Sequence, residues 1–189
     1  EEPNTTDELF AIAESIRTRA YVEPARVSYT AGAALDRSVY SSESAFVTYG
    51  VSAYINYTVE TWWAQYEGVD NYINYFQGMS DGVLSSAVTR QTGRLKALEA
   101  TEEMMEYTRL YPSAERDAYR RAQNEVVMGQ SLFMANGDWF DNEMRTTAEG
   151  LGDRACVIKM MKTPVISAII SKTPSITSDK MLSDVVEAI

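Results

Sequence analysis

The stretch INYTVETWWAQYEGVDNYINYF, residues 55–76, decides the fold that the sequence predicts. Its large apolar side chains recur at alternating steps of four and three residues, which is the a/d spacing of a helix packed lengthwise against other helices. The side chains on this stripe are Ile55, Val59, Trp62, Tyr66, Val69, Ile73 and Phe76. Three heptads of this kind predict a long, coiled-coil-like helix that needs partners of similar length.

The same three–four spacing and the turn residues predict further helices on both sides of this stretch. Thr5 and Glu8 form a capping box that begins the first helix, and Tyr111-Pro112 ends the third. Gly78 and the run Ser80-Asp81-Gly82 supply the turn between the second helix and the third. The four main helices are expected over residues 5–21, 31–77, 81–111 and 113–149.

The C-terminal third is less regular. Residues 165–170 are ambiguous between helix and strand, and residues 180–188 are predicted to form a last helix after the Ser178-Asp179 cap. We therefore predict an all-α, up-and-down helical bundle of at least four main helices, in a single domain over residues 1–189 with an irregular segment at 153–189.

Composition limits the classes of partner. The chain has 189 residues, a hydrophobic fraction of 45% and a formal net charge of −10, which is typical of one soluble, folded domain. An acidic surface repels phosphate, so nucleic acid is not expected as a partner. The most apolar stretch, residues 157–170, is short and is interrupted by Lys159, Lys162 and Pro164, so no transmembrane segment is expected.

The absence of histidine excludes much of enzyme chemistry. It removes the commonest general base and metal ligand, and with them Ser-His-Asp and Cys-His catalysis. Cys156 is the single cysteine, so neither an intrachain disulfide nor a zinc cage is possible, and it is expected to be a small buried apolar residue. We expect no metal and no cofactor, and the chain favours a non-enzymatic role.

The N-terminus bears on localisation. It begins Glu1-Glu2-Pro3-Asn4 with neither methionine nor a signal peptide, which favours a processed, exported protein or an excised ectodomain. Such a protein could associate with a membrane through a partner or a removed segment. Two glycosylation sequons, at Asn4 and Asn56, are of a kind that often arises by chance.

Aromatic residues crowd into residues 49–76, and those off the main stripe have two interpretations. Either the helix is central and buries a second face, or that face contacts another chain, because tyrosine and tryptophan are preferred anchors of interfaces. The interface candidates are Tyr54, Trp63, Tyr72 and Tyr75. We expect these four side chains to be at least partly accessible and to contact a protein partner or a second copy.

Three carboxylates are candidates for chemistry. If the third and fourth helices are antiparallel neighbours, Glu102 comes close to Gln123 or Glu125, with Glu143 further along, and paired carboxylates can bind a hard cation. The alternative is that these carboxylates lie at the edge of the bundle and pair with Arg109 or Arg121. The acidic run from Glu99 to Glu106 is expected to be a solvated helix face.

No motif identifies a family, so the sequence leaves the functional class open. The first hypothesis is a non-enzymatic interaction module, such as an assembly subunit or an extracytoplasmic sensor domain. The alternative is a binder of a small apolar or aromatic ligand, lined by Trp62, Tyr66, Met105 and Met128, with Met104 and Met134 nearby. A carboxylate–metal enzyme is the third hypothesis.

Overall fold

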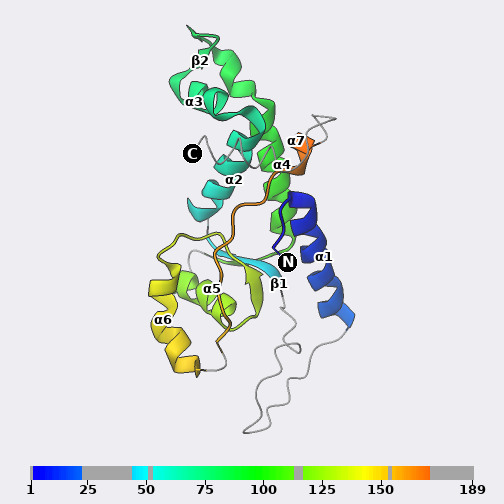
Figure 1. Cartoon of the computed structure of the whole chain (residues 1–189), viewed down its shortest axis with the longest axis vertical. Helices are drawn as coiled ribbons and strands as arrows, with labels where there is room; N and C mark the ends of the chain where they lie inside the picture. The colour runs from blue at the N-terminus through cyan, green and yellow to red at the C-terminus, as the bar shows by residue number, and fades with distance from the viewer. Residues whose placement is uncertain (1, 23–43, 51–52, 113–116, 153–154, 171–189) are drawn as a thin grey trace. The chain divides into compact units, whose positions relative to one another are not determined.

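The computed structural model describes residues 2–22, 44–50, 53–112, 117–152 and 155–170 (Figure 1). These residues form helices together with a three-stranded parallel sheet and a two-stranded antiparallel hairpin. The fold is therefore mixed α/β, and the prediction of an all-α helical bundle is wrong.

The parallel sheet has β1 (Ser44–Tyr49) at its centre, between β4 (Thr108–Tyr111) and β5 (Ser131–Phe133). Phe46 is aligned with Thr108 on one side and with Phe133 on the other. Helix α5 (Ala118–Val127) connects β4 to β5 and packs against all three strands, as Figure 1 shows for α5 and β1. A β-strand, a helix and a parallel strand in sequence form a crossover unit of α/β proteins.

Strand β1 lies inside the region predicted as one helix over residues 31–77. Its residues 45–48 are all buried, as expected for a central parallel strand that is covered on both faces. The sequence Ala-Phe-Val-Thr is rich in β-branched and aromatic side chains, which suits this position. The heptad stripe begins only at Ile55, after the strand, so it contained no information about these residues.

The stripe itself divides at Gly68. Helix α2 (Ala53–Glu67) ends there, and α3 (Val69–Gln77) begins after a residue whose φ of +84° favours glycine. Trp62 on α2 is fully buried, whereas Phe76 on α3 is 64% exposed. The a/d pattern is thus real on each helix, but the two halves have different environments and do not form one continuous helix.

The helix predicted over residues 81–111 is replaced by several short elements. Strands β2 (Met79–Ser80) and β3 (Val83–Leu84) pair in antiparallel fashion around Asp81 and Gly82, which both have positive φ. An Asp-Gly pair is a preferred hairpin turn, and the turn predicted at residues 78–82 is confirmed. A 3₁₀ helix, η2 (Ser86–Arg90), then α4 (Thr92–Glu106) and β4 follow.

The helix predicted over residues 113–149 is also wrong. Helix α5 ends in a Schellman motif, in which Gln130 N–H donates to the Glu125 carbonyl and Gly129 N–H donates to the Val126 carbonyl. Gly129 has a φ of +73°, which explains why the helix stops there. After β5, the chain forms α6 (Phe140–Leu151), capped by Gly152.

The two ends of the described chain are closer to expectation. Helix α1 (Thr6–Val22) begins with one of the two bonds of the predicted capping box, because Glu8 N–H donates to the Thr5 hydroxyl at 3.2 Å. The Glu8 carboxylate accepts from Asn4 N–H at 2.7 Å instead of from Thr5 N–H. Residues 165–170, which were ambiguous between strand and helix, contain some of each. Val165 forms a β-bridge with Thr5, and α7 spans Ser167–Ile170. The helix predicted at residues 180–188 lies outside the described residues.

The chain groups into two compact units. Unit 1 comprises the described residues within Glu1–Leu9, Asn56–Glu102 and Thr163–Ile189, and unit 2 those within Phe10–Ile55 and Glu103–Lys162. The core of unit 1 includes Leu9, Trp62, Trp63, Val88, Ala97 and Ile166. The core of unit 2 includes Val47, Met104, Ala122, Val127, Phe140 and Met144. The single-domain organisation stays a prediction.

None of the helices in the described part of the chain combines the length and the hydropathy that a bilayer crossing needs.

Candidate functional site

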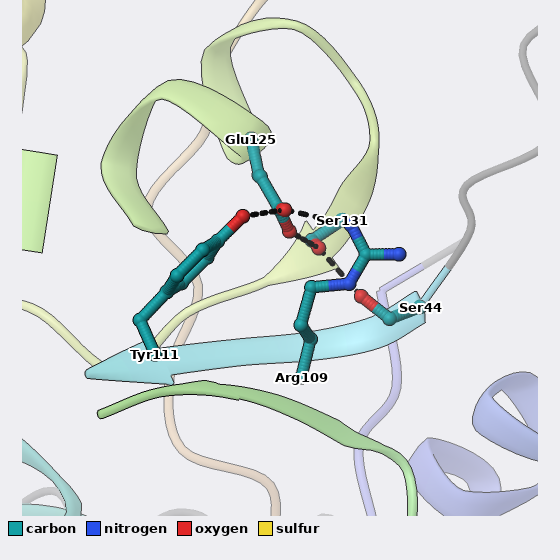
Figure 2. Close-up of polar contacts among 5 residues, drawn as sticks. All are labelled: Ser44, Arg109, Tyr111, Glu125 and Ser131. Atoms are coloured by element: carbon teal, nitrogen blue, oxygen red, sulfur yellow. Dashed lines mark hydrogen bonds and ion pairs between the residues drawn. The ribbon is translucent and has the colours of Figure 1, made fainter. Parts of the chain in front are cut away.

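A network of polar side chains in unit 2 surrounds the carboxylate of Glu125 on α5 (Figure 2). Glu125 is 3% exposed, and its carboxylate lies over the sheet. The other members are Ser44, Arg109, Tyr111 and Ser131, which we call, together with Glu125, the Glu125 network. Ser44 lies on β1, Arg109 and Tyr111 on β4, and Ser131 on β5, so each strand of the sheet contributes to it.

Both oxygens of the Glu125 carboxylate accept hydrogen bonds. Oε1 accepts from Nη1 of Arg109 at 2.7 Å and from the hydroxyl of Tyr111. Oε2 accepts from the hydroxyl of Ser131 at 2.8 Å, and the Ser131 and Ser44 hydroxyl oxygens are 2.6 Å apart. Charge-assisted hydrogen bonds of this kind offset the cost of removing a carboxylate from water.

Local structure explains how these groups meet. Arg109 and Tyr111 are two residues apart on β4, so their side chains point to the same face of the sheet. Ser44 and Ser131 are aligned partners where β1 and β5 begin. Glu125 lies in the last turn of α5, and its backbone carbonyl takes part in the Schellman motif that leads directly into β5.

The environment of Tyr111 keeps its hydroxyl protonated. Burial raises the pKa of Tyr111 above its ordinary value, and the hydrogen bond to Glu125 and the charge of that carboxylate raise the pKa further. The Arg109 guanidinium partly opposes this shift. The guanidinium of Arg121 lies 4.5 Å from the centre of the Tyr111 ring, which is within the range of a cation–π contact.

This geometry suits positioning rather than catalysis. A general acid or base must reach a reacting group, but the Glu125 side chain is buried and its oxygens already accept from three donors of the chain. The contacts connect α5 to all three strands. We therefore interpret the Glu125 network as the structural connection that holds α5 against the sheet.

The other candidate carboxylates lie elsewhere. Glu125 pairs with Arg109, as one alternative predicted, but it is buried and not at the edge of a bundle, as that alternative expected; Arg121 stacks on Tyr111. Glu143 is exposed and accepts from Nε2 of Gln123 at 2.6 Å, and Glu102 is exposed on the part of α4 that belongs to unit 1. Among the described residues, no three acidic or cysteine side chains gather in a way that could hold a metal ion.

The interface candidates divide between the units. In unit 1, the Trp63 ring makes edge contacts with Tyr72 and Tyr75 at centroid distances of 5.0 and 4.6 Å, and its Nε1 donates to Gln91. Trp63 is buried, so the expectation that it would be accessible is wrong, whereas Tyr72 and Tyr75 are half-buried. The half-buried Tyr54 contacts Tyr49 and Trp139 in unit 2.

Tyr72 also has a charged neighbour. Burial raises the pKa of Tyr72, and the charge of Glu60 and a hydrogen bond to it raise the pKa further.

The candidates for a ligand pocket also divide between the units. Trp62 is fully buried in unit 1, where its Nε1 donates to the Pro164 carbonyl at 2.9 Å, and Tyr66 is half-buried in the same unit. Met105 and Met128 are half-buried in unit 2. Cys156 is half-buried rather than buried.

Sequence reasoning missed the most exposed apolar surface of unit 1. None of the nine residues of α3 is buried, although the helix is amphipathic. Leu84 lies within reach of Gly78, which caps α3, and pairs with Met79, so its side chain continues the surface of the helix. Val83, the adjacent residue of β3, points to the opposite face of the hairpin. We call the exposed side chains on this surface the apolar face; they are Val69, Ile73, Phe76 and Leu84. The heptad pattern identified three of them, but as core residues.

No protein-family model, no curated protein and no solved structure matches this chain.

Proposed function

We propose that this chain is a non-enzymatic interaction module that binds a protein partner through the apolar face of unit 1. The observation that carries the proposal is the exposure of large apolar side chains along α3 and the hairpin that follows. Phe76 is 64% and Leu84 77% exposed. Scattered apolar residues are normal on a protein surface, but exposed large apolar side chains gathered on one helix and the adjoining strand are typical of a binding site.

Helix α3 is built to present this face. Its tyrosines, Tyr72 and Tyr75, pack against Trp63, while Val69 and Ile73 lie on the stripe that faces solvent. Covering an exposed Phe, Leu or Ile side chain contributes about 1.5–3 kcal/mol, so contact with a partner would recover a large amount of free energy. One face of α3 thus packs on the aromatic cluster around Trp63, and the opposite face is available to a partner.

The support beneath α3 is well ordered. Gln91 accepts from the Trp63 indole at 2.7 Å and donates to the Asn71 carbonyl at 2.6 Å, which connects α2, α3 and the loop before α4. The Arg94 guanidinium lies 5.7 Å from the Trp63 ring centre and 5.4 Å from that of Tyr75. A binding surface held in place before association loses less conformational entropy when the partner arrives.

The chemistry of the described residues also favours binding over catalysis. The buried carboxylate of Glu125 is fully engaged in holding α5 on the sheet. The apolar face lies within one unit. These two observations support an interaction module ahead of a small-ligand binder or a carboxylate–metal enzyme.

A capture experiment tests this proposal with two matched double variants. The face variant carries Ile73→Glu and Leu84→Glu, which place charges on the apolar face. The control variant carries Val157→Glu and Met160→Glu, which are exposed apolar positions of unit 2, at 73% and 69%. Circular dichroism first establishes that both variants remain folded.

The immobilised full chain is then exposed to an extract of its source cells, and bound proteins are quantified by mass spectrometry. We expect the wild type and the control variant to retain the same protein, which can be a second copy of this chain, and the face variant to lose at least about 90% of it. Equal retention by all three forms would show that the apolar face is not the binding surface.

A further inference from the structure

We propose that the occupant of the apolar face is a second copy of this chain, in a two-fold dimer where the same face of each copy meets the other. This inference rests on the proposed function and specifies its partner. In such an arrangement every contact occurs twice, so the surface must be compatible with itself in charge, hydrogen bonding and shape.

Charge is the first argument. The chain has a formal net charge of −10, so two copies repel one another over most of their surface. Residues 68–89, which contain α3 and the hairpin, carry only two charged side chains, Asp70 and Asp81. A partner attracted by charge would instead be basic and would bind an acidic region such as the run from Glu99 to Glu106. A nearly uncharged face is where a partner of equal negative charge can approach.

Composition is the second argument. The central part of a protein interface is depleted in charged residues and enriched in aromatic ones, more so in homodimers than in transient complexes. Helix α3 has one charged residue and three aromatic residues among nine. Its exposed polar positions include Gln77, and Asn74 is half-buried. A carboxamide both donates and accepts hydrogen bonds, so such residues can pair with the same residue type of a second copy.

Shape is the third argument. Val69, Ile73 and Phe76 follow the a/d spacing with which one helix packs lengthwise against another. The adjoining hairpin has strands of only two residues, and a two-stranded hairpin is marginally stable in water. Leu84 of β3 is among its most exposed side chains. A copy of α3 placed against the stripe and the hairpin would cover both features at once.

Sedimentation equilibrium of the full chain over a wide range of concentration measures the association directly. We expect the mass of the wild type and of the control variant to rise from one chain to two. The face variant, with Ile73→Glu and Leu84→Glu, should remain a single chain at concentrations at least about tenfold above the wild-type midpoint.

A distance measurement locates the interface. In a Cys156→Ser background, Ala87→Cys provides one spin-label site at an exposed position of unit 1 outside the apolar face. Double electron–electron resonance should give one short distance between copies, and an excess of unlabelled wild type should abolish it because labelled chains then pair with unlabelled ones.

The outcomes separate the two proposals. A wild type that stays monomeric at all concentrations overturns the dimer, and the capture experiment then decides by itself whether the apolar face binds a different protein. A dimer that persists in the folded face variant places self-association on another surface and also overturns this inference. Loss of both dimerisation and capture in the face variant alone supports the two proposals together.

Discussion

Arg109 on β4 donates to Glu125 on α5 across 2.7 Å, joining the guanidinium of a strand residue to the buried carboxylate of the helix that follows it. The contact forms within one βαβ crossover, between residues 16 positions apart. Because Tyr111 and Ser131 donate to the same carboxylate, it connects the strand before the helix to the strand after it. This one side chain therefore joins α5 to both of its flanking strands, in addition to the packing of the helix on the sheet.

Replacing that side chain should destabilise the fold. Glu125→Gln keeps the shape but removes the charge, leaving Arg109 without its carboxylate and disturbing the bonds from Tyr111 and Ser131. We expect a loss of about 2–4 kcal/mol in the free energy of unfolding, measured by urea denaturation followed by circular dichroism. Glu102→Gln, at an exposed position of α4, is the matched control and should change stability by less than about 0.5 kcal/mol. Equal effects of the two changes would contradict the structural role of Glu125.

Tyr111 should make stability depend on alkaline pH. Its pKa is raised in the folded chain, so folding favours the protonated phenol. The contribution is complete below the ordinary tyrosine pKa of 10.0 and is lost as pH rises through the higher pKa of the folded state. The difference in unfolding free energy between wild type and Tyr111→Phe should therefore be constant near neutral pH and should shrink above about pH 10. Absorbance titration of the phenolates should also show one fewer late-titrating tyrosine in the variant.

Trp62 is the largest fully buried side chain of unit 1, and its truncation should be costly. Trp62→Ala opens a cavity and leaves the Pro164 carbonyl without its indole donor, so we expect a loss of about 3–5 kcal/mol. Trp139→Ala removes the same atoms from a residue that is 41% exposed and should cost clearly less. Thermal unfolding of both variants provides the comparison, and a similar melting temperature for the two would exclude a core role for Trp62.

Gly129 should resist substitution for two separate reasons. Its φ of +73° strains any L side chain, and a Cβ there would lie 2.6 Å from the Cys156 sulfur. Gly129→Ala should cost more than the roughly 1–2 kcal/mol of left-handed strain alone. Adding Cys156→Ala should recover the steric part only, and Gly150→Ala, where space is open, should be neutral or slightly stabilising. No recovery in the double variant would show that the sulfur does not restrict this position.

The sequence contained good information about local structure. The capping bond from Glu8 N–H to the Thr5 hydroxyl and the turn around Asp81-Gly82 were predicted from a few adjacent residues, and both are present. These features depend on backbone conformation and on hydrogen bonds between near neighbours. Such signals depend little on the rest of the fold, so predictions made from them can be correct even when the overall architecture is predicted incorrectly.

The heptad stripe misled because periodicity shows which side chains share a helical face and not what covers that face. Trp62 and Phe76 occupy equivalent positions of the same pattern, yet one is buried and the other exposed. Gly68 was a signal in the sequence that the helix could end there, since glycine weakens a helix and suits positive φ. The short run at residues 45–48 was likewise a strand signal, but a four-residue apolar run does not distinguish a buried strand from a helix.

The candidate site was predictable only in part. Pairing of Glu125 with Arg109 was one of two alternatives, because both residues flank the same Pro112 connection. The participation of Ser44 and Ser131 depends on β1 lying between β4 and β5, and no local pattern encodes that strand order. The heptad pattern found three residues of the apolar face but predicted that they would be buried. Whether a side chain is exposed is decided by tertiary packing, which the pattern does not show.

The strand order also affects the order in which the sheet can form during synthesis. Strand β1 is synthesised first but occupies the central position, so it requires β4 and then β5 before its backbone groups are paired on both sides. At roughly 5–20 residues per second, the ribosome leaves the apolar run at residues 45–48 unpaired for several seconds. Pairing between distant segments is also slow to form. Aggregation during biosynthesis is therefore expected to begin at β1, and slower synthesis after residue 50 should increase the fraction of chain that becomes insoluble.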